Sequence, residues 1–174
     1  MTTSDPASAM KVDAMVVPGV GAFGACMTGL REHGLDRSVR EFAETDRPLL
    51  GVCLGMQVLF DRSEEGDAEG LGLLSGNVVR LSGEVKVPHM GWNDVTWTGT
   101  HPMTEGLTPL STFYFVHSYA CVPRDTDMTV GETEYGSRFA AAVGHDKLFG
   151  TQFHPEKSGD AGIEIYRNLV KAAS

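Results

Sequence analysis

The segment Gly51-Val-Cys-Leu-Gly55 places a cysteine between two glycines, where a predicted strand meets a predicted helix. Leu49 to Val52 has the apolar pattern of a short buried strand, and Leu54 to Phe60 that of the start of a helix. Glycines on both sides permit a sharp turn that exposes the side chain at position 53 as a nucleophile. A thiol at a helix N-terminus lies near the positive end of the dipole, which favours the thiolate. The alternative is that Cys53 is a small buried apolar residue.

The segment Gly150-Thr-Gln-Phe-His-Pro-Glu156 supplies a candidate base for that thiol. It overlaps a predicted strand, and alternate residues of extended backbone point the same way, so His154 and Glu156 can share a face. Glu156 would then fix the tautomer in which His154 accepts the thiol proton. The alternative is an unconnected surface histidine and glutamate that happen to follow a strand.

A third segment, Val16-Val-Pro-Gly-Val-Gly-Ala-Phe23, follows the first predicted strand of the chain. Glycine-rich backbone in this position can direct N–H groups at an oxyanion, with the N–H of Leu54 as a second donor. The alternatives are an ordinary tight turn or a weak phosphate-binding loop. The segment lacks the spacing of a dinucleotide or Walker motif.

The order of predicted elements indicates an α/β fold. The first half alternates a strand at Asp13 to Val17 with helices at Ala22 to His33 and Leu35 to Thr45, and Ser63 to Gly70 is predicted as a solvated acidic loop. The second half is rich in strands, predicted at Asn77 to Leu81, Trp92 to Trp97, Thr112 to Tyr119, Thr129 to Glu134, Phe139 to Val143 and Leu148 to Phe153. A helix at Ile163 to Ala172 closes the chain. This order predicts an α/β sandwich whose mixed sheet carries an added antiparallel part.

Composition excludes several classes of function. A net charge of −9 argues against nucleic-acid binding, which relies on Lys and Arg to neutralise phosphates. No apolar stretch has the length of a membrane span and no signal peptide is present, which predicts a soluble, cytoplasmic protein without membrane contact. The three cysteines and six histidines lack the spacing of a disulfide framework or metal site, so we expect no metal and no cofactor.

The three motif segments together resemble those of the class I glutamine amidotransferases, whose signature is a Gly-x-Cys-x-Gly elbow followed later by His-x-Glu. Three further stretches, Pro18 to Phe23, Val87 to Asn93 and Phe113 to Tyr119, resemble the glutaminase subunits of imidazole glycerol phosphate synthases, of histidine biosynthesis. The resemblance implies one glutamine amidotransferase domain over residues 1–174. Its fold would be a flavodoxin-like α/β sandwich, a mixed sheet with helices on both faces.

The resemblance also implies roles for individual residues. Cys53 would attack the side-chain amide of L-glutamine, with His154 as acid and base and Glu156 as its orienting partner. Gly19, Val20 and Gly21 match the oxyanion strand of the family, with Leu54 as the second donor. The positions that match those holding the polar end of glutamine are Gln57, Glu65, Ser118 and Tyr119. The positions that match the surface facing the cyclase subunit are His89, Met90, Trp92, Asn93 and Lys157.

In this family the two subunits form a heterodimer, and ammonia passes through the barrel-shaped cyclase subunit to its nucleotide substrate. Glutaminase activity is low until the partner and its ligand are bound. Trp92 could equally be a core residue, since tryptophan suits both interior and interface. His117 is expected to be structural rather than catalytic.

One feature departs from the family pattern. Members begin with an Asp-Tyr-Gly-x-Gly-Asn-like strand, a helix and a second strand, a unit of roughly thirty residues, and the sequence lacks it before Thr3. We therefore expect an N-terminally truncated sheet with an uncovered apolar edge.

Three rival functions remain at this stage. One is a glutaminase serving anthranilate, GMP or carbamoyl phosphate synthesis. The second is a non-catalytic binding or regulatory homologue, and the third is a cysteine peptidase of similar fold.

Overall fold

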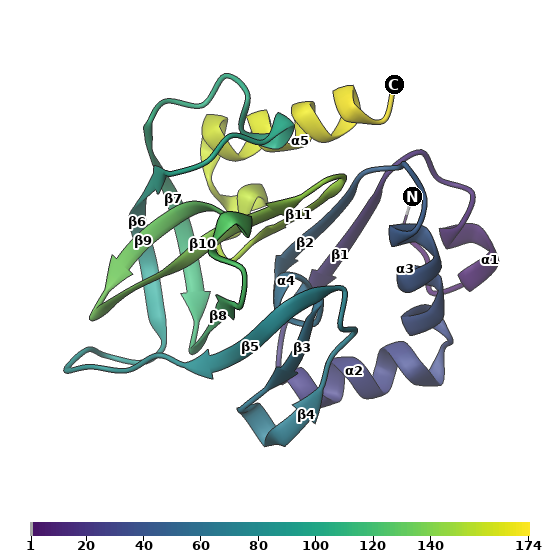
Figure 1. Ribbon diagram of the computed structural model, residues 1–174, viewed down its shortest axis with the longest axis horizontal. Helices are drawn as coiled ribbons and strands as arrows, with labels where there is room; N and C mark the ends of the chain where they lie inside the picture. Colours follow the sequence, from purple (N-terminus) through teal and green to yellow (C-terminus); the bar gives the residue numbers. More distant parts are fainter. Residues whose placement is uncertain (1) are drawn as a thin grey trace.

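A computed structural model describes residues 2–174, which form two β-sheets with helices around them (Figure 1). The larger sheet has seven strands, in the order β1 (Met15–Gly19), β2 (Leu49–Cys53), β11 (Leu148–Thr151), β10 (Ser137–His145), β9 (Thr129–Tyr135), β6 (His89–Trp97) and β7 (Leu110–His117). Strands β1, β2 and β11 run parallel, and every pairing beyond β11 is antiparallel. The predicted mixed sheet with an antiparallel part is confirmed.

The smaller sheet has four strands, in the order β4 (Ala68–Glu69), β3 (Phe60–Ser63), β5 (Leu74–Arg80) and β8 (Tyr119–Pro123). This second sheet corrects three predictions. The helix after Cys53 ends at Gln57 rather than Phe60, because Phe60 pairs with Leu74 in β3. The segment predicted as a loop from Ser63 to Gly70 contains the short helix η1 (Glu65–Asp67) and strand β4. The strand predicted through Tyr119 divides between the two sheets.

Five α-helices lie around the sheets, at α1 (Pro6–Ala9), α2 (Phe23–Glu32), α3 (Leu35–Ala43), α4 (Leu54–Gln57) and α5 (Gly159–Ala172). Short 3-10 turns, in addition to η1, occur at η2 (Pro102–Thr104), η3 (Thr126–Met128) and η4 (Pro155–Lys157). Helix α1 begins where the Asp5 carboxylate accepts a hydrogen bond from the Ser8 N–H at 2.9 Å, a standard N-cap. None of the helices within residues 2–174 is both long and apolar enough to cross a bilayer.

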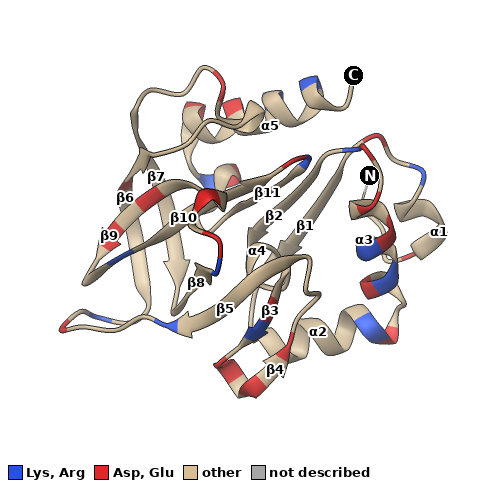
Figure 2. Cartoon of the chain, viewed as in Figure 1, with Lys and Arg blue, Asp and Glu red and all other residues tan. Residues whose placement is uncertain are grey.

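Strand β2 lies at the centre of the core and is buried along its whole length. Leu49 belongs to one apolar cluster, with Val39 and Phe42 of α3, whereas Leu50 belongs to a second cluster with Ile165 of α5. Alternate residues of the strand therefore face opposite layers, so helices cover both faces of the sheet, as predicted. Neither β1 nor β2 carries a charged residue, as Figure 2 shows, which is typical of parallel strands covered on both sides.

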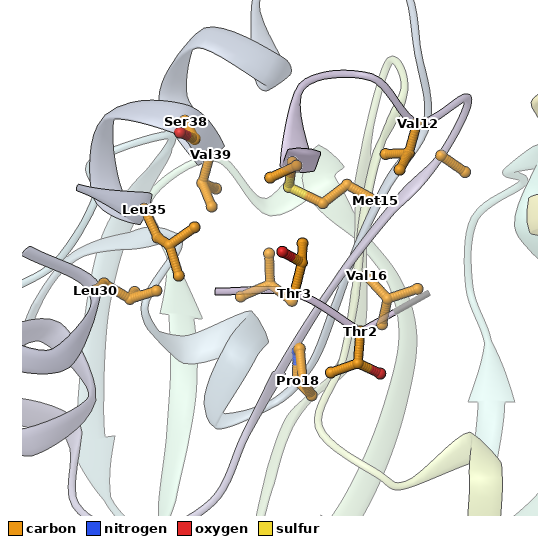
Figure 3. A pocket seen from close by; sticks show the side chains of 13 residues that line it. Thr2, Thr3, Val12, Met15, Val16, Pro18, Leu30, Leu35, Ser38 and Val39 are labelled. Atoms are coloured by element: carbon orange, nitrogen blue, oxygen red, sulfur yellow. The ribbon is translucent and has the colours of Figure 1, made fainter. Parts of the chain in front are cut away.

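Strand β1 is an edge of the larger sheet, and a hollow of about 470 Å³ lies beside it (Figure 3). The side chains around the hollow are mostly apolar and include Val12, Met15, Val16, Leu35 and Val39. The sequence predicts an uncovered apolar sheet edge; β1 has a strand neighbour on one side only and Val16 is 39% exposed, but Met15 and Val17 are buried.

Candidate active site

The turn between β2 and α4 holds Cys53 in a backbone conformation that is rare for a residue with a side chain. Its φ is 54° and its ψ is −111°, in the positive-φ region that costs about 1–3 kcal/mol. The flanking glycines make this possible: a Cβ on Gly51 would lie 2.8 Å from the Gly55 carbonyl oxygen, and one on Gly55 would lie 1.8 Å from the Val17 carbonyl oxygen. The elbow predicted from the sequence is present, and sterics require both of its glycines.

The Cys53 sulfur lies in a buried environment with few polar neighbours. Sγ is 3.9 Å from the Val116 carbonyl oxygen, and the Gln152 side-chain amide donates to Sγ at 3.7 Å. Burial raises the pKa of the Cys53 thiol to about 11, although the Leu54 N–H and Gln152 lower it. Burial outweighs these hydrogen bonds, so the protonated thiol, rather than the predicted thiolate, is the favoured form of Cys53 in this structure.

His154 and Glu156 lie together, as the sequence predicts. His154 Nδ1 is 2.7 Å from Glu156 Oε1. The imidazole is 3% exposed, and its main-chain N–H donates to the Tyr114 carbonyl at 2.9 Å. Because Nδ1–H donates to the carboxylate, Nε2 is left as an acceptor. Within residues 2–174, this Nε2 is the one buried side-chain nitrogen or oxygen without a hydrogen-bond partner.

A pocket of about 290 Å³ joins these groups. Its lining comprises Val20, Gly21, Cys53, Leu54, Gln57, Glu65, Pro88, Val116, His117, Ser118, Tyr119 and His154. All the residues predicted for the triad, the oxyanion donors and glutamine binding line the pocket, except Gly19 and Glu156. Glu156 reaches the pocket through His154. Gly19 packs beneath the elbow instead, where a Cβ would lie 2.8 Å from the Gly55 nitrogen.

Gln57 and Glu65 have fixed positions at one side of the pocket. Gln57 Nε2 donates to the Tyr119 carbonyl at 2.9 Å and to Gln152 Oε1 at 3.0 Å, which uses both amide hydrogens. Its Oε1 remains available as an acceptor. One oxygen of Glu65 accepts from the Phe23 N–H at 2.7 Å, at the start of α2. Both side chains can therefore offer oxygen acceptors to a positively charged group.

Ser118 and Tyr119 lie where the chain leaves β7 and enters β8, so they belong to the junction of the two sheets. The Tyr119 carbonyl accepts from His117 Nδ1 at 2.8 Å as well as from Gln57. The Ser118 carbonyl accepts from the Leu81 N–H at 2.9 Å. These bonds hold the junction rigidly against the pocket.

His89 corrects an expectation, since its side chain points into the protein rather than toward a partner. The ring is buried and stacked 4.0 Å from the ring of Tyr135, and Nδ1 lies 2.9 Å from Nε2 of His117. Burial lowers the pKa of His89 to about 4 and that of His117 to about 3. His117 makes structural contacts, as expected, and it also lines the pocket.

Strand β6 presents other side chains to solvent. Met90 is 63% exposed and Trp92 is 59% exposed, so Trp92 is a surface residue and the core alternative is wrong. Asn93 turns partly inward and donates to the Glu134 carbonyl at 3.0 Å. Lys157 is exposed on η4, with Nζ 5.8 Å from the centre of the Tyr114 ring. The exposed face therefore combines two large apolar side chains, Met90 and Trp92, with the positive charge of Lys157.

The sequence motifs gave no role to Gln152, which the structure places between Cys53 and Gln57. No signal in the sequence marks it, apart from its position two residues before His154. Among residues 2–174, no three His, Cys, Asp or Glu side chains are grouped so as to hold a metal ion.

The fold and the site define a class of protein. A family model described as "Glutamine amidotransferase class-I" matches residues 2–173, so the chain belongs to the class I glutamine amidotransferase family. Solved structures agree at the level of fold. A protein from Thermoplasma acidophilum, described as part of a putative GMP synthase, has a TM-score of 0.72 at 20% identity, covering 97% of this chain and 76% of that one. A second structure, described as a glutamine amidotransferase, has a TM-score of 0.71 at 23% identity, covering 98% and 84%.

Within the family, the chain is similar to subunits of imidazole glycerol phosphate synthase. It is 46% identical to imidazole glycerol phosphate synthase subunit HisH of Dehalococcoides mccartyi strain CBDB1, over 98% of this chain and 84% of the relative. It is also 46% identical to the protein of the same description from Chromobacterium violaceum, over 97% of this chain and 82% of the relative.

Proposed function

We propose that this chain, as a single domain, is the glutaminase subunit of an imidazole glycerol phosphate synthase. It hydrolyses L-glutamine to glutamate and ammonia, which a cyclase subunit uses in L-histidine biosynthesis. Identity of 46% to two HisH proteins over nearly the whole chain supports this assignment. The observation that carries the chemistry is the buried, unpartnered Nε2 of His154, in the same pocket as the elbow cysteine.

Catalysis begins with the attack of Cys53 on the side-chain amide of glutamine. As the Sγ–carbon bond forms, the thiol proton passes to His154 Nε2, and the imidazolium is stabilised by Glu156. The amide oxygen becomes an oxyanion, which the N–H of Leu54 and the backbone of the Val20–Gly21 loop would stabilise. Return of the proton from His154 to the amide nitrogen expels ammonia and leaves a glutamyl thioester on Cys53.

Hydrolysis of the thioester uses the same groups in reverse. His154 Nε2 takes a proton from water as the water oxygen attacks the thioester carbon, and the proton then returns to the sulfur as it leaves. Glutamate is released and the thiol is restored. Because burial raises the pKa of Cys53 to about 11, the thiol rests protonated, and its activation depends on His154.

The polar end of glutamine would be held by the pocket residues Gln57, Glu65, Ser118 and Tyr119. Glu65 and the free Oε1 of Gln57 supply acceptors for the α-ammonium group. The Ser118–Tyr119 junction lies close enough to supply donors for the α-carboxylate. A pocket of about 290 Å³ suits a small amino acid better than a peptide, which argues against a cysteine peptidase.

The surface for the cyclase subunit would be the exposed face that contains Met90, Trp92 and Lys157. Aromatic residues and methionine are enriched at interfaces, where they dominate the binding energy. The partner would accept ammonia directly and form imidazole glycerol phosphate. The three free cysteines suit a reducing compartment, so we place the heterodimer in the cytoplasm.

The first test is glutamate formation from glutamine, measured with a cyclase subunit and its nucleotide ligand present. The parent chain is expected to be active and Cys53→Ala inactive, with unchanged binding to the cyclase. Trp92→Ala should instead weaken that binding by about 2 kcal/mol, because it removes an exposed aromatic anchor. Activity with the synthase subunit of a different amidotransferase, such as that for anthranilate, but none with the cyclase subunit, would reject the assignment in favour of another class I glutaminase.

A further inference from the structure

Gln152 lies between Cys53 and Gln57, and it received no role from the sequence motifs. It is 0% exposed and follows β11, where its main-chain N–H donates to the Ala141 carbonyl at 2.8 Å. Its side-chain Nε2 is 3.7 Å from Cys53 Sγ, and its Oε1 accepts from Gln57 Nε2 at 3.0 Å. Both ends of the amide are thus engaged, one of them with the reacting sulfur.

The orientation of the Gln152 amide is fixed by its neighbours. Gln57 must direct its NH₂ group toward the Tyr119 carbonyl, because a carbonyl can only accept. The second hydrogen of the same NH₂ group then points at Gln152, which must present its oxygen to Gln57. The NH₂ group of Gln152 is left facing Cys53. The network therefore forces Gln152 to offer a donor to the sulfur.

Two neutral histidines, His117 and His89, extend this hydrogen-bond network from the Tyr119 carbonyl. His117 Nδ1–H donates to the Tyr119 carbonyl, which leaves His117 Nε2 to accept from His89 Nδ1–H at 2.9 Å. His89 Nε2 in turn accepts from Asn93 Nδ2 at 3.4 Å. All the donor directions agree with neutral rings, as the pKa values of about 3 and about 4 require near neutral pH. The Tyr119 carbonyl is thus held in place as the anchor for Gln57.

We propose that Gln152 is a positioning residue for glutamine hydrolysis, whose N–H holds the Cys53 sulfur and stabilises the thiolate as His154 removes its proton. This inference rests on the proposed function, since it concerns the same nucleophile. A hydrogen bond to a charged acceptor is about twice as strong as one between neutral groups. The N–H of Gln152 therefore stabilises the thiolate more than the thiol, which lowers the barrier to attack.

A purely structural role would have a different signature. Gln152 also satisfies Gln57, so its loss would lower stability whether or not it acts on the sulfur. Only stabilisation of the thiolate by Gln152 changes the reactivity of Cys53 in a folded chain. The rate at which a thiol reagent alkylates Cys53 separates the two roles, because the thiolate is the reacting form.

The experiment compares alkylation of Cys53 by iodoacetamide across a range of pH. Mass spectrometry of the Cys53 peptide distinguishes it from Cys26 and Cys121. Gln152→Met keeps the volume but removes the donor, and we expect the thiol pKa to rise by about one unit. The higher intrinsic reactivity of a more basic thiolate partly offsets this, so alkylation at fixed pH should slow about threefold.

Thr151→Val is the matched control. Thr151 is buried beside Gln152, and its hydroxyl donates to the Phe153 carbonyl at 3.0 Å, away from the sulfur. We expect Thr151→Val to lower stability without changing the rate of alkylation. Gln152→Glu keeps the shape of the side chain, so it repeats the comparison if Gln152→Met does not fold. At alkaline pH the ionised carboxylate of Gln152→Glu repels the thiolate, so it should slow alkylation at least as much as Gln152→Met does.

Equal alkylation rates for the parent and a folded Gln152 variant would overturn the proposal. The result is separable from the assignment of function, because alkylation requires neither glutamine nor a partner. If the parent hydrolyses glutamine and the Gln152 variants alkylate normally, only the positioning role fails. If the Gln152 variants alkylate slowly but the parent hydrolyses no glutamine even with the cyclase subunit and its nucleotide ligand present, the proposed function fails instead.

Discussion

The two walls of the active-site pocket are held by different forces. On one wall, the β2–α4 elbow fixes Cys53 through backbone contacts that leave no room for a Cβ on Gly51 or Gly55. On the neighbouring wall, where the chain leaves the adjacent strand β11, side-chain hydrogen bonds fix His154 and Gln152. Substitutions of the elbow glycines therefore cause steric clashes, whereas at the second wall single substitutions can remove single hydrogen bonds.

The largest effect on stability is expected from Gly55→Ala, which introduces a steric clash in the elbow. The new Cβ would lie 1.8 Å from the Val17 carbonyl oxygen, so strand β1 must separate from α4. We expect a loss of at least about 3 kcal/mol in the free energy of unfolding, measured by urea denaturation.

The matched control for Gly55→Ala is Gly29→Ala within α2. A Cβ at Gly29 would meet nothing within 4 Å, and alanine favours the helix by about 0.5–1 kcal/mol. We expect this variant to be slightly more stable than the parent. Equal effects at the two glycines would show that the elbow is not sterically constrained.

Glu156→Gln tests the hydrogen-bonded wall with less structural damage. The side chain of Glu156 is 44% exposed, so the variant should fold, but it no longer supplies a negative charge to the His154 imidazolium. We expect kcat for glutamine hydrolysis to fall at least about 10²-fold, with little change in KM.

Glu164→Gln, at a carboxylate of α5 that pairs with Arg167, controls for the loss of one surface charge. It should leave kcat unchanged. A kcat for Glu156→Gln within twofold of the parent would mean that His154 does not depend on Glu156.

His117→Gln tests the pH dependence of stability. Burial lowers the pKa of His117 from 6.5 to about 3, so between these values the unfolded chain binds a proton that the folded chain does not. Stability contributed by neutral His117 is therefore present above pH 6.5 and is lost as pH falls toward 3. We expect the variant to flatten this slope by up to about 1.4 kcal/mol per pH unit. An unchanged slope would show that His117 is not buried as a neutral ring.

The contrast between the two walls also explains what could be predicted from the sequence. The elbow is visible in five consecutive residues, because its glycines meet a local steric demand. The helices α2 and α3 and the strands β1 and β11 were likewise predicted to within a few residues, since apolar periodicity is local. His154 and Glu156 were paired correctly because they are only two residues apart.

Features that depend on distant pairing could not be predicted. Phe60 enters a strand because Leu74 pairs with it, and the strand predicted through Tyr119 divides because β8 pairs with β5. Gln152 contacts residues 53 and 57, which lie far from it in the sequence. His89 looked like a surface residue, yet its neighbours Phe115, His117 and Tyr135 come from other strands. None of these contacts leaves a mark in the local sequence.

A chloroketone analogue of glutamine, located by peptide mass mapping, tests whether Cys53 and His154 form one site for glutamine. We expect label on Cys53 alone, protection by excess glutamine, and much slower labelling in His154→Ala. Label spread over Cys26 and Cys121, or label on Cys53 that neither glutamine nor the loss of His154 affects, would contradict a shared site.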